Sequence, residues 1–307
     1  MKKIISIVSP VYNEEGNIKF FYNELKKVLT TLKSEYEIIF VNDGSNDNSL
    51  VYLVEIAQID DKVKIINLSR NFGHQLAITA GLDNAKGDCV IILDSDLQDP
   101  PSLISDLISK WENGYQIVNA KRRSRQDSFF KNLSAKVFYK FLNSILTNKI
   151  PENVGDYRLL DKKAVCILQN IKEKDRYLRG LSTWIGFKQT EVLFDREKRF
   201  SGKTHYPFSK MLSLALNAVF SFSRLPMKLA TFFSTFFLLV SLGTIIYVVL
   251  SLIQGHTVAG WASTLLIFAV FSGIQMMVLA IISEYVGRIY TQVQNRPLYI
   301  IDEIIEK

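Results

Sequence analysis

Short apolar runs alternate with stretches of helical period through the first 120 residues of the chain. Runs rich in β-branched residues that end at polar turns predict strands at 3–9, 36–42, 63–68, 89–93 and 117–120. Between them, apolar residues recur every three or four positions and predict helices at 17–32, 50–59, 73–85 and 102–112. Such alternation is typical of an α/β domain with a doubly wound, mostly parallel sheet.

A different pattern begins at Leu229, after which no Asp, Glu, Lys or Arg occurs before Glu284. The segments 229–253 and 261–283 each exceed the roughly 20 residues that cross a bilayer core, so we expect a hairpin of two transmembrane helices. Basic residues flank the outer ends of this hairpin and are absent from the linker 254–260, which predicts cytosolic termini by the positive-inside rule. The alternative, a hairpin buried in a soluble protein, is disfavoured because so long an uncharged stretch is unusual in water.

These patterns divide the chain into four parts. Residues 1–205 form the α/β domain, and 206–228 form an amphipathic helix in the membrane interface, with a core helix of the soluble domain as the alternative. Residues 229–283 carry the two spans, and 284–307 form a cytosolic C-terminal tail. The first residues lack the long apolar core of a signal peptide, so we expect a multi-pass protein of the cell membrane with its α/β domain in the cytosol.

Charge and cysteine content narrow the functional classes. The net charge of +7 is compatible with an anionic membrane or a phosphate-rich substrate. No helix-turn-helix, zinc-knuckle or RNA-binding motif accompanies this charge, so nucleic acid is not an expected partner. Two isolated cysteines, Cys89 and Cys166, are too few for a disulfide framework or a zinc site.

Polar clusters follow four of the predicted strands, at 10–14, 42–45, 94–99 and 121–125. In doubly wound sheets the ligand binds outside the carboxyl ends of the strands, where these clusters would meet. Each cluster alone could be an ordinary hydrophilic loop, but four at one rim indicate a binding site.

The cluster after the fourth strand contains Asp94 and Asp96, with Gln98 and Asp99 close behind. A few hard oxygen ligands are typical of Mg²⁺ or Mn²⁺ that bridges substrate phosphates. Neither a G-x-G-x-x-G fingerprint nor a P-loop occurs, so metal and basic side chains would have to neutralise a bound diphosphate.

Three motifs at this rim carry a family resemblance: SPVYNEEGNI at 9–18, FVNDGSNDNS at 40–49 and ILDSDLQDPP at 92–101. Together they resemble the family-two glycosyltransferases of GT-A type. Further downstream, GDYRLLD (155–161), RYLRGLSTWIG (176–186), REKRFSGKTHYP (196–207) and EYVGRIY…RPLY (284–299) are similar to its polyprenyl-phosphate branch. That branch includes bactoprenol glucosyltransferases and dolichol-phosphate mannose synthases. No tryptophan lies in the Q-x-x-R-W motif of the chain polymerases, so processive polymerisation is not implied.

The resemblance implies a role for each motif residue. The catalytic residues would be Asp156, Asp94 and Asp96. The donor-binding residues would be Pro10, Tyr12, Asn13, Glu14, Asp43 and Asp94, and the metal ligands Asp94, Asp96 and Gln98. The residues that bind the acceptor or a phosphate would be Arg122, Arg125, Lys131, Arg196, Arg199 and Lys203. Of these, Arg122 and Arg125 would face the acceptor phosphate, and Arg196 and Arg199 would bind either the diphosphate or lipid headgroups.

Some assignments stay open at this point. Arg176 and Arg179 are further candidates for phosphate contacts, whereas His74 is expected only to start a helix. Asp156 either takes a proton or orients the acceptor or the metal. His205 stands where the family often has Lys, which leaves the contacts of its loop undecided.

The resulting hypothesis is an enzyme that transfers a sugar from a nucleoside diphosphate sugar to undecaprenyl or another polyprenyl phosphate at the cytoplasmic membrane face. UDP-glucose and UDP-N-acetylglucosamine are the leading donors by resemblance, the product serves cell-envelope glycan modification, and a homo-oligomer is left open. One alternative is a membrane-anchored glycosyltransferase for diacylglycerol or protein, whose neutral acceptor would need a base and less positive charge. Another is a transport or flippase subunit, which two spans without an intramembrane charge do not favour.

Overall fold

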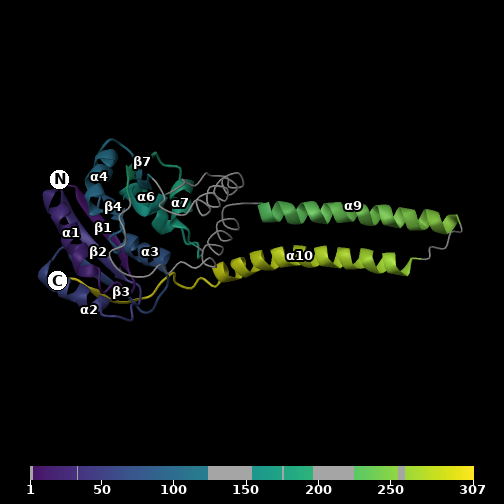
Figure 1. Cartoon of the computed structure of the whole chain (residues 1–307), viewed down its shortest axis with the longest axis horizontal. Helices are drawn as coiled ribbons and strands as arrows, with labels where there is room; N and C mark the ends of the chain where they lie inside the picture. Colours follow the sequence, from purple (N-terminus) through teal and green to yellow (C-terminus); the bar gives the residue numbers. More distant parts are fainter. Residues whose placement is uncertain (1–2, 33, 124–153, 175, 196–224, 255–259) are drawn as a thin grey trace. The chain divides into compact units, whose positions relative to one another are not determined.

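The structure is a computed structural model that describes residues 3–32, 34–123, 154–174, 176–195, 225–254 and 260–307. The chain divides into two compact units. The first unit contains the α/β region and the residues Arg296–Lys307, and the second contains the two long helices (Figure 1).

Strands and helices alternate along the first unit as the hydrophobic pattern predicts. In chain order its elements are β1 (Ile4–Val11), α1 (Ile18–Thr31), β2 (Glu35–Asn42), α2 (Ser49–Ile59), β3 (Val63–Leu68), α3 (His74–Asn84), β4 (Cys89–Ile92), the 3-10 turn η1 (Pro101–Leu103), α4 (Ile104–Glu112), β5 (Ile117–Arg122), β6 (Val154–Asp161), α6 (Lys162–Asn170), α7 (Leu178–Trp184), β7 (Gln189–Phe194) and β8 (Ile301–Ile305). The nine segments predicted within the first 120 residues are all present, and their ends agree within two residues.

The strands form one sheet in the order β7-β5-β6-β4-β1-β2-β3-β8. Among the strands that the structure describes, six run in one direction, and β6 and β8 run antiparallel to their neighbours. The predicted α/β class with a mostly parallel sheet is therefore confirmed. The insertion of β6 between β4 and β5, and the addition of β8 to the edge at β3, are not visible in the hydrophobic pattern.

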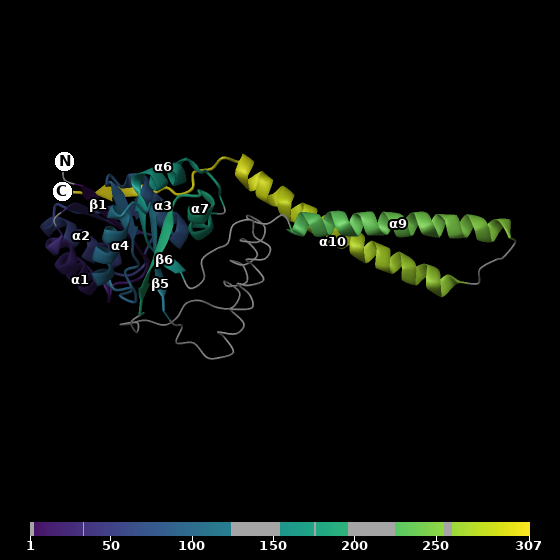
Figure 2. The same ribbon diagram turned by 90° about the horizontal axis from the view of Figure 1, so that it is seen from above.

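Helices cover both faces of the sheet, which explains why β1 and β2 are apolar without alternation. Figure 2 shows α3, α6 and α7 on one side and α1 and α2 on the other. Ile5, Ile7 and Phe21 belong to the core cluster on the α1 side. On the opposite face, a Cβ at Gly81 of α3 would lie 2.2 Å from Val8 Cγ1, so only glycine lets this helix pack so close to β1.

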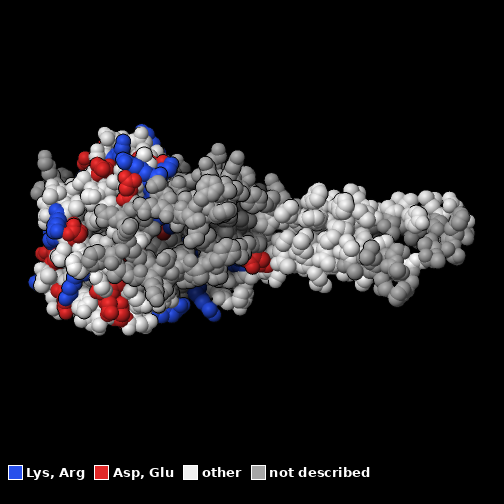
Figure 3. All heavy atoms as spheres, in the orientation of Figure 1, with Lys and Arg blue, Asp and Glu red and all other residues white. Residues whose placement is uncertain are grey.

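The second unit consists of α9 (Leu225–Ile253) and α10 (Trp261–Val293), whose Phe237 and Phe271 rings pack edge to face with centroids 5.0 Å apart. In the view of Figure 3, charged side chains gather on the first unit, whereas the coloured residues of the two helices that face the reader include almost none. Within the part of the chain that the structure describes, one helical segment, Val270–Val293, is long and apolar enough to cross a membrane. The two-span hairpin and its orientation stay predictions.

Two segments of the predicted domain division, 206–228 and 284–307, contribute residues to described elements. The interfacial helix expected at 206–228 lies outside the described residues except for its last four, which begin α9. The segment expected to be a tail, 284–307, contributes the end of α10 and the edge strand β8. Lys64 of β3 and Glu306 form an ion pair of 2.8 Å beside that strand.

Candidate active site

The polar loops that follow β1, β2, β4 and β5 meet at one rim of the sheet, as their positions predict. The backbone N–H of Asn13 donates to Ser45 Oγ at 3.0 Å, which joins the loops after β1 and β2. Ser95 Oγ, after β4, donates to the carbonyl of Pro10 at 3.2 Å. Arg122, at the end of β5, lies 3.6 Å from the buried carboxylate of Asp99 through its Nη2 atom.

Most of the predicted donor-binding residues after β1 hold the loops of this rim together. Asn13 adopts a left-handed φ of +54° and its Oδ1 accepts a hydrogen bond from the N–H of Asn46 at 2.9 Å. The N–H of Glu14 donates to Ser49 Oγ at 2.9 Å, and its Oε2 accepts from Asn17 Nδ2. Tyr12, by contrast, is 44% exposed, so its side chain forms part of the open surface of this loop.

Asp43 is buried and serves the turn ahead of α3. Its two carboxylate oxygens accept hydrogen bonds from the N–H groups of Phe72 and Gly73, at 2.7 and 3.0 Å. Burial raises the pKa of Asp43, although these two N–H groups oppose the shift. Gly44, at φ +65°, lets the loop approach the backbone of Arg70. A Cβ atom on residue 44 would lie only 2.5 Å from the carbonyl carbon of Arg70. In the structure, the Asp43 carboxylate therefore stabilises the turn that leads into the N-terminus of α3.

The predicted metal ligands lie directly after β4. Asp96 Oδ1 accepts a hydrogen bond from the N–H of Gln98 at 3.1 Å, across Leu97 at φ +59°. Asp94 Oδ1 is buried without a hydrogen-bond partner among the described residues. Burial raises the pKa of Asp94, the charge of His74 opposes this shift, and the carboxylates of Asp156 and Asp96 add to it.

The residues after β4 fit a divalent cation that takes only part of its ligand shell from the protein. Among the described residues, no group of three or more His, Cys, Asp or Glu side chains is close enough to enclose a metal ion. Mg²⁺ is usually held by one or two carboxylates, with water and substrate phosphates completing the shell. A cation would pair with the buried Asp94 oxygen that lacks a hydrogen bond, and it would offset the charges of Asp156 and Asp96 that raise the pKa of Asp94.

The catalytic candidate Asp156 reaches the rim because β6 runs antiparallel to β4. Ile92 of β4 pairs with Arg158 of β6 in this antiparallel ladder. Asp94 lies two residues after Ile92, and Asp156 lies two residues before Arg158, so the two aspartates lie at the same end of the sheet. Asp156 is 6% exposed. Two carboxylates that are far apart in the sequence thus share one end of the sheet.

Asp156 is held by donors from two other elements. Arg179 of α7 forms a fork to it, with Nε 2.9 Å from Oδ1 and Nη2 2.9 Å from Oδ2. From α3, His74 Nε2 lies 3.3 Å from Oδ2, and Gln75 Nε2 donates to the same oxygen at 3.2 Å. Burial would raise the pKa of Asp156, but Arg179 and His74 outweigh it and hold that pKa well below the usual range. The carboxylate is therefore ionised and surrounded by donors.

Arg158 supports this arrangement from inside the protein. Its side chain is 2% exposed, with Nη1 donating to Ser182 Oγ and Nη2 to the carbonyl of Gly155 at 2.7 Å. Burial lowers its pKa to about 10, and the nearby charge of Asp156 opposes the shift, so Arg158 stays protonated at neutral pH. A buried cation beside Asp156 further stabilises the carboxylate.

His74 belongs to the site, although the sequence analysis assigned it only to a helix start. Nε2 lies 3.6 Å from Asp94 Oδ1 and 3.3 Å from Asp156 Oδ2, so the ring joins the two carboxylates. Burial acts to lower its pKa, but the charge of Asp94 and the hydrogen bond to Asp156 prevail and raise it to about 9. The signal for this residue is its place: it begins the helix that follows β3, at the rim where the other loops end.

Arg179, a candidate for phosphate contacts, is paired with Asp156, and the other phosphate-binding candidates divide into three groups. Arg122 lies at the rim, and its side chain is 22% exposed. Its guanidinium packs closely against Gly155, because a Cβ atom on residue 155 would lie 3.2 Å from Arg122 Nη2. Arg176 instead donates to the carbonyls of Leu168 and Ile171 at the end of α6, which gives it a structural role. The other candidates lie outside the described residues: Arg125, Lys131, Arg196, Arg199 and Lys203.

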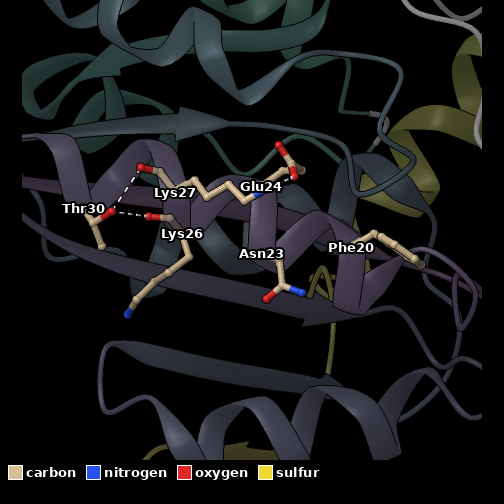
Figure 4. Close-up of a pocket in the computed structure, with 6 residues that line it drawn as sticks. All are labelled: Phe20, Asn23, Glu24, Lys26, Lys27 and Thr30. Atoms are coloured by element: carbon tan, nitrogen blue, oxygen red, sulfur yellow. Dashed lines mark hydrogen bonds and ion pairs between the residues drawn. The ribbon is translucent and has the colours of Figure 1, made fainter.

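A separate hollow of about 530 Å³ lies on the outer face of α1 (Figure 4). Its lining residues all belong to that helix: Phe20, Asn23, Glu24, Lys26, Lys27 and Thr30. None of them is a rim residue, and Lys26 is paired with Asp60. This hollow has no part in the site described above.

Comparison with known proteins gives consistent matches. The sequence profile of glycosyl transferase family 2 matches residues 6–168. A glycosyltransferase of Synechocystis sp. without an assigned activity is 45% identical over 302 residues, covering 98% of this chain and 95% of the relative. A prophage-derived bactoprenol glucosyl transferase of Shigella flexneri is 38% identical over 299 residues and 97% of both chains. Among solved structures, mannosyl-3-phosphoglycerate synthase from Rubrobacter xylanophilus aligns with a TM-score of 0.48 and 16% identity, over 71% of this chain and 72% of that one.

Proposed function

The chain belongs to glycosyl transferase family 2 and is a glycosyltransferase, and on that premise we propose that it transfers a sugar from a nucleoside diphosphate sugar to a polyprenyl phosphate. The observation that carries this proposal is the similarity to bactoprenol glucosyl transferases over 97% of the chain, which includes the apolar C-terminal helices. The proposed acceptor is undecaprenyl phosphate and the proposed donor UDP-glucose, with UDP-N-acetylglucosamine as the second choice. The product would be a lipid-linked sugar for glycans of the cell envelope.

The charges of the rim suit two phosphate-bearing substrates. An oxygen of the acceptor phosphate attacks the anomeric carbon of the sugar, the bond from that carbon to the diphosphate breaks, and its electron pair leaves with the diphosphate oxygen. Arg122, together with Arg125 and Lys131 from the following segment, is proposed to face the acceptor phosphate, where a guanidinium can form two parallel hydrogen bonds. Mg²⁺ or Mn²⁺ at Asp94, Asp96 and Gln98 would supply positive charge to the departing diphosphate.

The contacts of Asp156 support an orienting role over that of a proton acceptor. Its Oδ2 atom is faced by Arg179, His74 and Gln75, and its Oδ1 atom by Arg179. A phosphate monoester is already largely ionised at neutral pH, because its second pKa is about 6. The attacking oxygen therefore needs no base, and Asp156 is proposed to hold Arg179 and His74 in place.

The two long helices are proposed to bring the site to a membrane. Both α9 and α10 would cross the bilayer, with the linker 254–260 outside and both termini in the cytosol. A water-soluble donor would then meet a lipid phosphate at the headgroup plane, which restricts the acceptor to favourable orientations.

The test is an assay of the full-length protein in detergent with undecaprenyl phosphate, Mg²⁺ or Mn²⁺, and a panel of UDP- and GDP-sugars. We expect labelled sugar in the lipid extract with one UDP-sugar, and release of UDP that depends on the lipid phosphate. Diacylglycerol and undecaprenol, which carry no phosphate, serve as matched acceptors and should give no product. Equal transfer to either neutral alcohol, or no lipid product with any donor, would overturn the proposal.

A further inference from the structure

Gln75 connects three elements of the active site through a single side chain. It is the second residue of α3, and its Nε2 atom donates to Asp156 Oδ2 of β6 at 3.2 Å. Its Oε1 atom accepts a hydrogen bond of 3.0 Å from the backbone N–H of Leu178, the first residue of α7. The residue that follows Leu178 is Arg179, whose guanidinium holds Asp156.

A neutral amide matches the chemistry of both hydrogen-bond partners at this position. A backbone N–H can only donate and an ionised carboxylate can only accept, so the side chain between Leu178 and Asp156 needs one acceptor and one donor. A glutamate would place an oxygen against Asp156, whereas a lysine would leave the N–H of Leu178 without an acceptor. The glutamine amide satisfies both partners, and its orientation follows from them.

The same small region controls the direction of the charged groups at the site. Asp43 holds the N–H of Gly73, His74 faces both Asp94 and Asp156, and Gln75 ties the same turn of α3 to Asp156. Loss of the amide would remove one of the contacts that fix the plane of the Asp156 carboxylate. The start of α7 would also lose its contact with α3, and the fork of Arg179 would move with both.

We propose that Gln75 is a positioning residue for glycosyl transfer, which fixes the plane of the Asp156 carboxylate and the start of α7 so that Arg179 faces the reacting phosphates. This inference rests on the proposed function for the identity of those phosphates. Gln75 itself touches no substrate in this scheme. Its removal should therefore slow the reaction step more than it weakens the binding of the donor.

Two substitutions separate this role from simple support of the fold. Gln75→Glu keeps the acceptor for Leu178 but turns the donor towards Asp156 into an acceptor, and Gln75→Met removes both hydrogen bonds at similar size. For both variants we expect kcat to fall about 10- to 100-fold, because a hydrogen bond to the charged Asp156 is lost in each. The KM for the nucleotide sugar should stay within about twofold of the wild-type value.

The pH profile supplies the decisive readout. The carboxyl group that Gln75→Glu introduces can donate to Asp156 only when it is protonated, and the charged groups around it are Asp156, His74 and Arg179. The ratio of variant to wild-type kcat should therefore rise as the pH falls for Gln75→Glu, whereas it should stay flat for Gln75→Met. A residue that acted only by filling space would give no reason for acid to restore one variant and not the other, and a residue that only supported the fold would change the melting temperature together with kcat.

Gln169 of α6 offers a matched control on a different contact of α3. Its Nε2 atom donates at 2.8 Å to the carbonyl of Leu82, near the end of α3 that is remote from the rim. Gln169→Glu removes this donor in the same way and should leave kcat within about twofold of wild type. The inference is overturned if Gln75→Glu and Gln75→Met keep wild-type kcat, if Gln169→Glu loses as much activity, or if the two Gln75 variants share one pH profile.

Release of the nucleoside diphosphate is measured with and without lipid phosphate. These two measurements distinguish a failure of the proposed acceptor from a failure of the positioning role of Gln75. If turnover ignores the lipid, the proposed acceptor is wrong, but the comparison of Gln75 variants with wild type is still measured on the turnover that occurs. If turnover requires the lipid and the Gln75 variants are unaffected, only the positioning role is wrong.

Discussion

Arg179 and Asp156 form a two-point ion pair at the rim of the sheet, with both nitrogen–oxygen distances at 2.9 Å. Arg179 is 27% exposed and Asp156 only 6%, so the pair presents the guanidinium side to the open rim. An ammonium keeps the charge but cannot form the planar fork.

Arg179→Lys should therefore lower kcat/KM about 10- to 100-fold, because one of two charge-assisted hydrogen bonds is lost at the site. The measurement is steady-state kinetics on the full chain, with circular dichroism to check that the fold persists. Wild-type kinetics in a folded Arg179→Lys protein would contradict the role given to the fork.

Asp96 tests the metal assignment. Asp96→Asn keeps an oxygen that can accept the hydrogen bond from the N–H of Gln98, so the turn after β4 should persist. It lacks the negative charge that a divalent cation requires, and we expect turnover to fall at least about 100-fold with an unchanged melting temperature. An enzyme that runs at full rate in excess EDTA would show that no metal takes part.

Arg122 separates the acceptor from the donor. Arg122→Ala should lower kcat/KM for the lipid phosphate about 10- to 150-fold, because the proposed bidentate contact to the acceptor phosphate would be lost. Binding of UDP with Mg²⁺ or Mn²⁺, measured by calorimetry, should change little. Arg123, the next residue, is 61% exposed and pairs with Asp195 at 3.4 Å, so Arg123→Ala is the control that should behave as wild type. Loss of UDP affinity in Arg122→Ala would move this arginine to the donor site.

Cysteine labelling tests the orientation of the two long helices. In a protein with Cys89 and Cys166 replaced by serine, a cysteine at Thr257 should react with a membrane-impermeant reagent added to intact cells. A cysteine at Asn295 should react only after the cells are opened. Labelling in the reverse order would overturn the proposed topology.

Asp60, which lies away from the rim, is expected to make the stability of the fold depend on pH. It is buried and is bound by Lys26 and by Tyr22, whose hydroxyl donates at 2.8 Å. Burial acts to raise the pKa of Asp60, but the hydrogen bonds from Lys26 and Tyr22 prevail and lower it from 3.8. A carboxyl with a lowered folded pKa stabilises the fold above its unfolded pKa, and this stability is lost as the pH falls through the folded pKa.

Asp60→Asn should thus lower the melting temperature by several degrees at pH 7, and the difference from wild type should shrink below about pH 4. The exposed pair of Glu24 and Lys27 serves as the control, since Glu24→Gln should have little effect at any pH. A difference for Asp60→Asn that stays constant from pH 7 to pH 3 would contradict the assigned pKa shift.

The hydrophobic pattern of the chain is enough to predict the elements of the first 120 residues and the rim at which their loops meet. Apolar periodicity is a local property, so β1 through β5 and the helices between them follow from residues that are near one another in the chain. The carboxyl ends of parallel strands share one edge, which is why Asn13, Asp94 and Arg122 could be placed together without a structure. The motif residue Asp156 was identified by resemblance, but not its neighbours.

The residues that surround Asp156 become visible only once the chain is folded. The strand β6 contains Asp156 and Arg158, whose charges hide it from a search for apolar runs, and α7 is too short to show a helical period. The insertion of β6 between β4 and β5, and the hydrogen bonds from His74, Gln75 and Arg179, join residues far apart in the chain. Such pairings are fixed by the packing of the whole sheet. The hydrophobic pattern depends only on residues that are near one another in the chain, so it does not predict them.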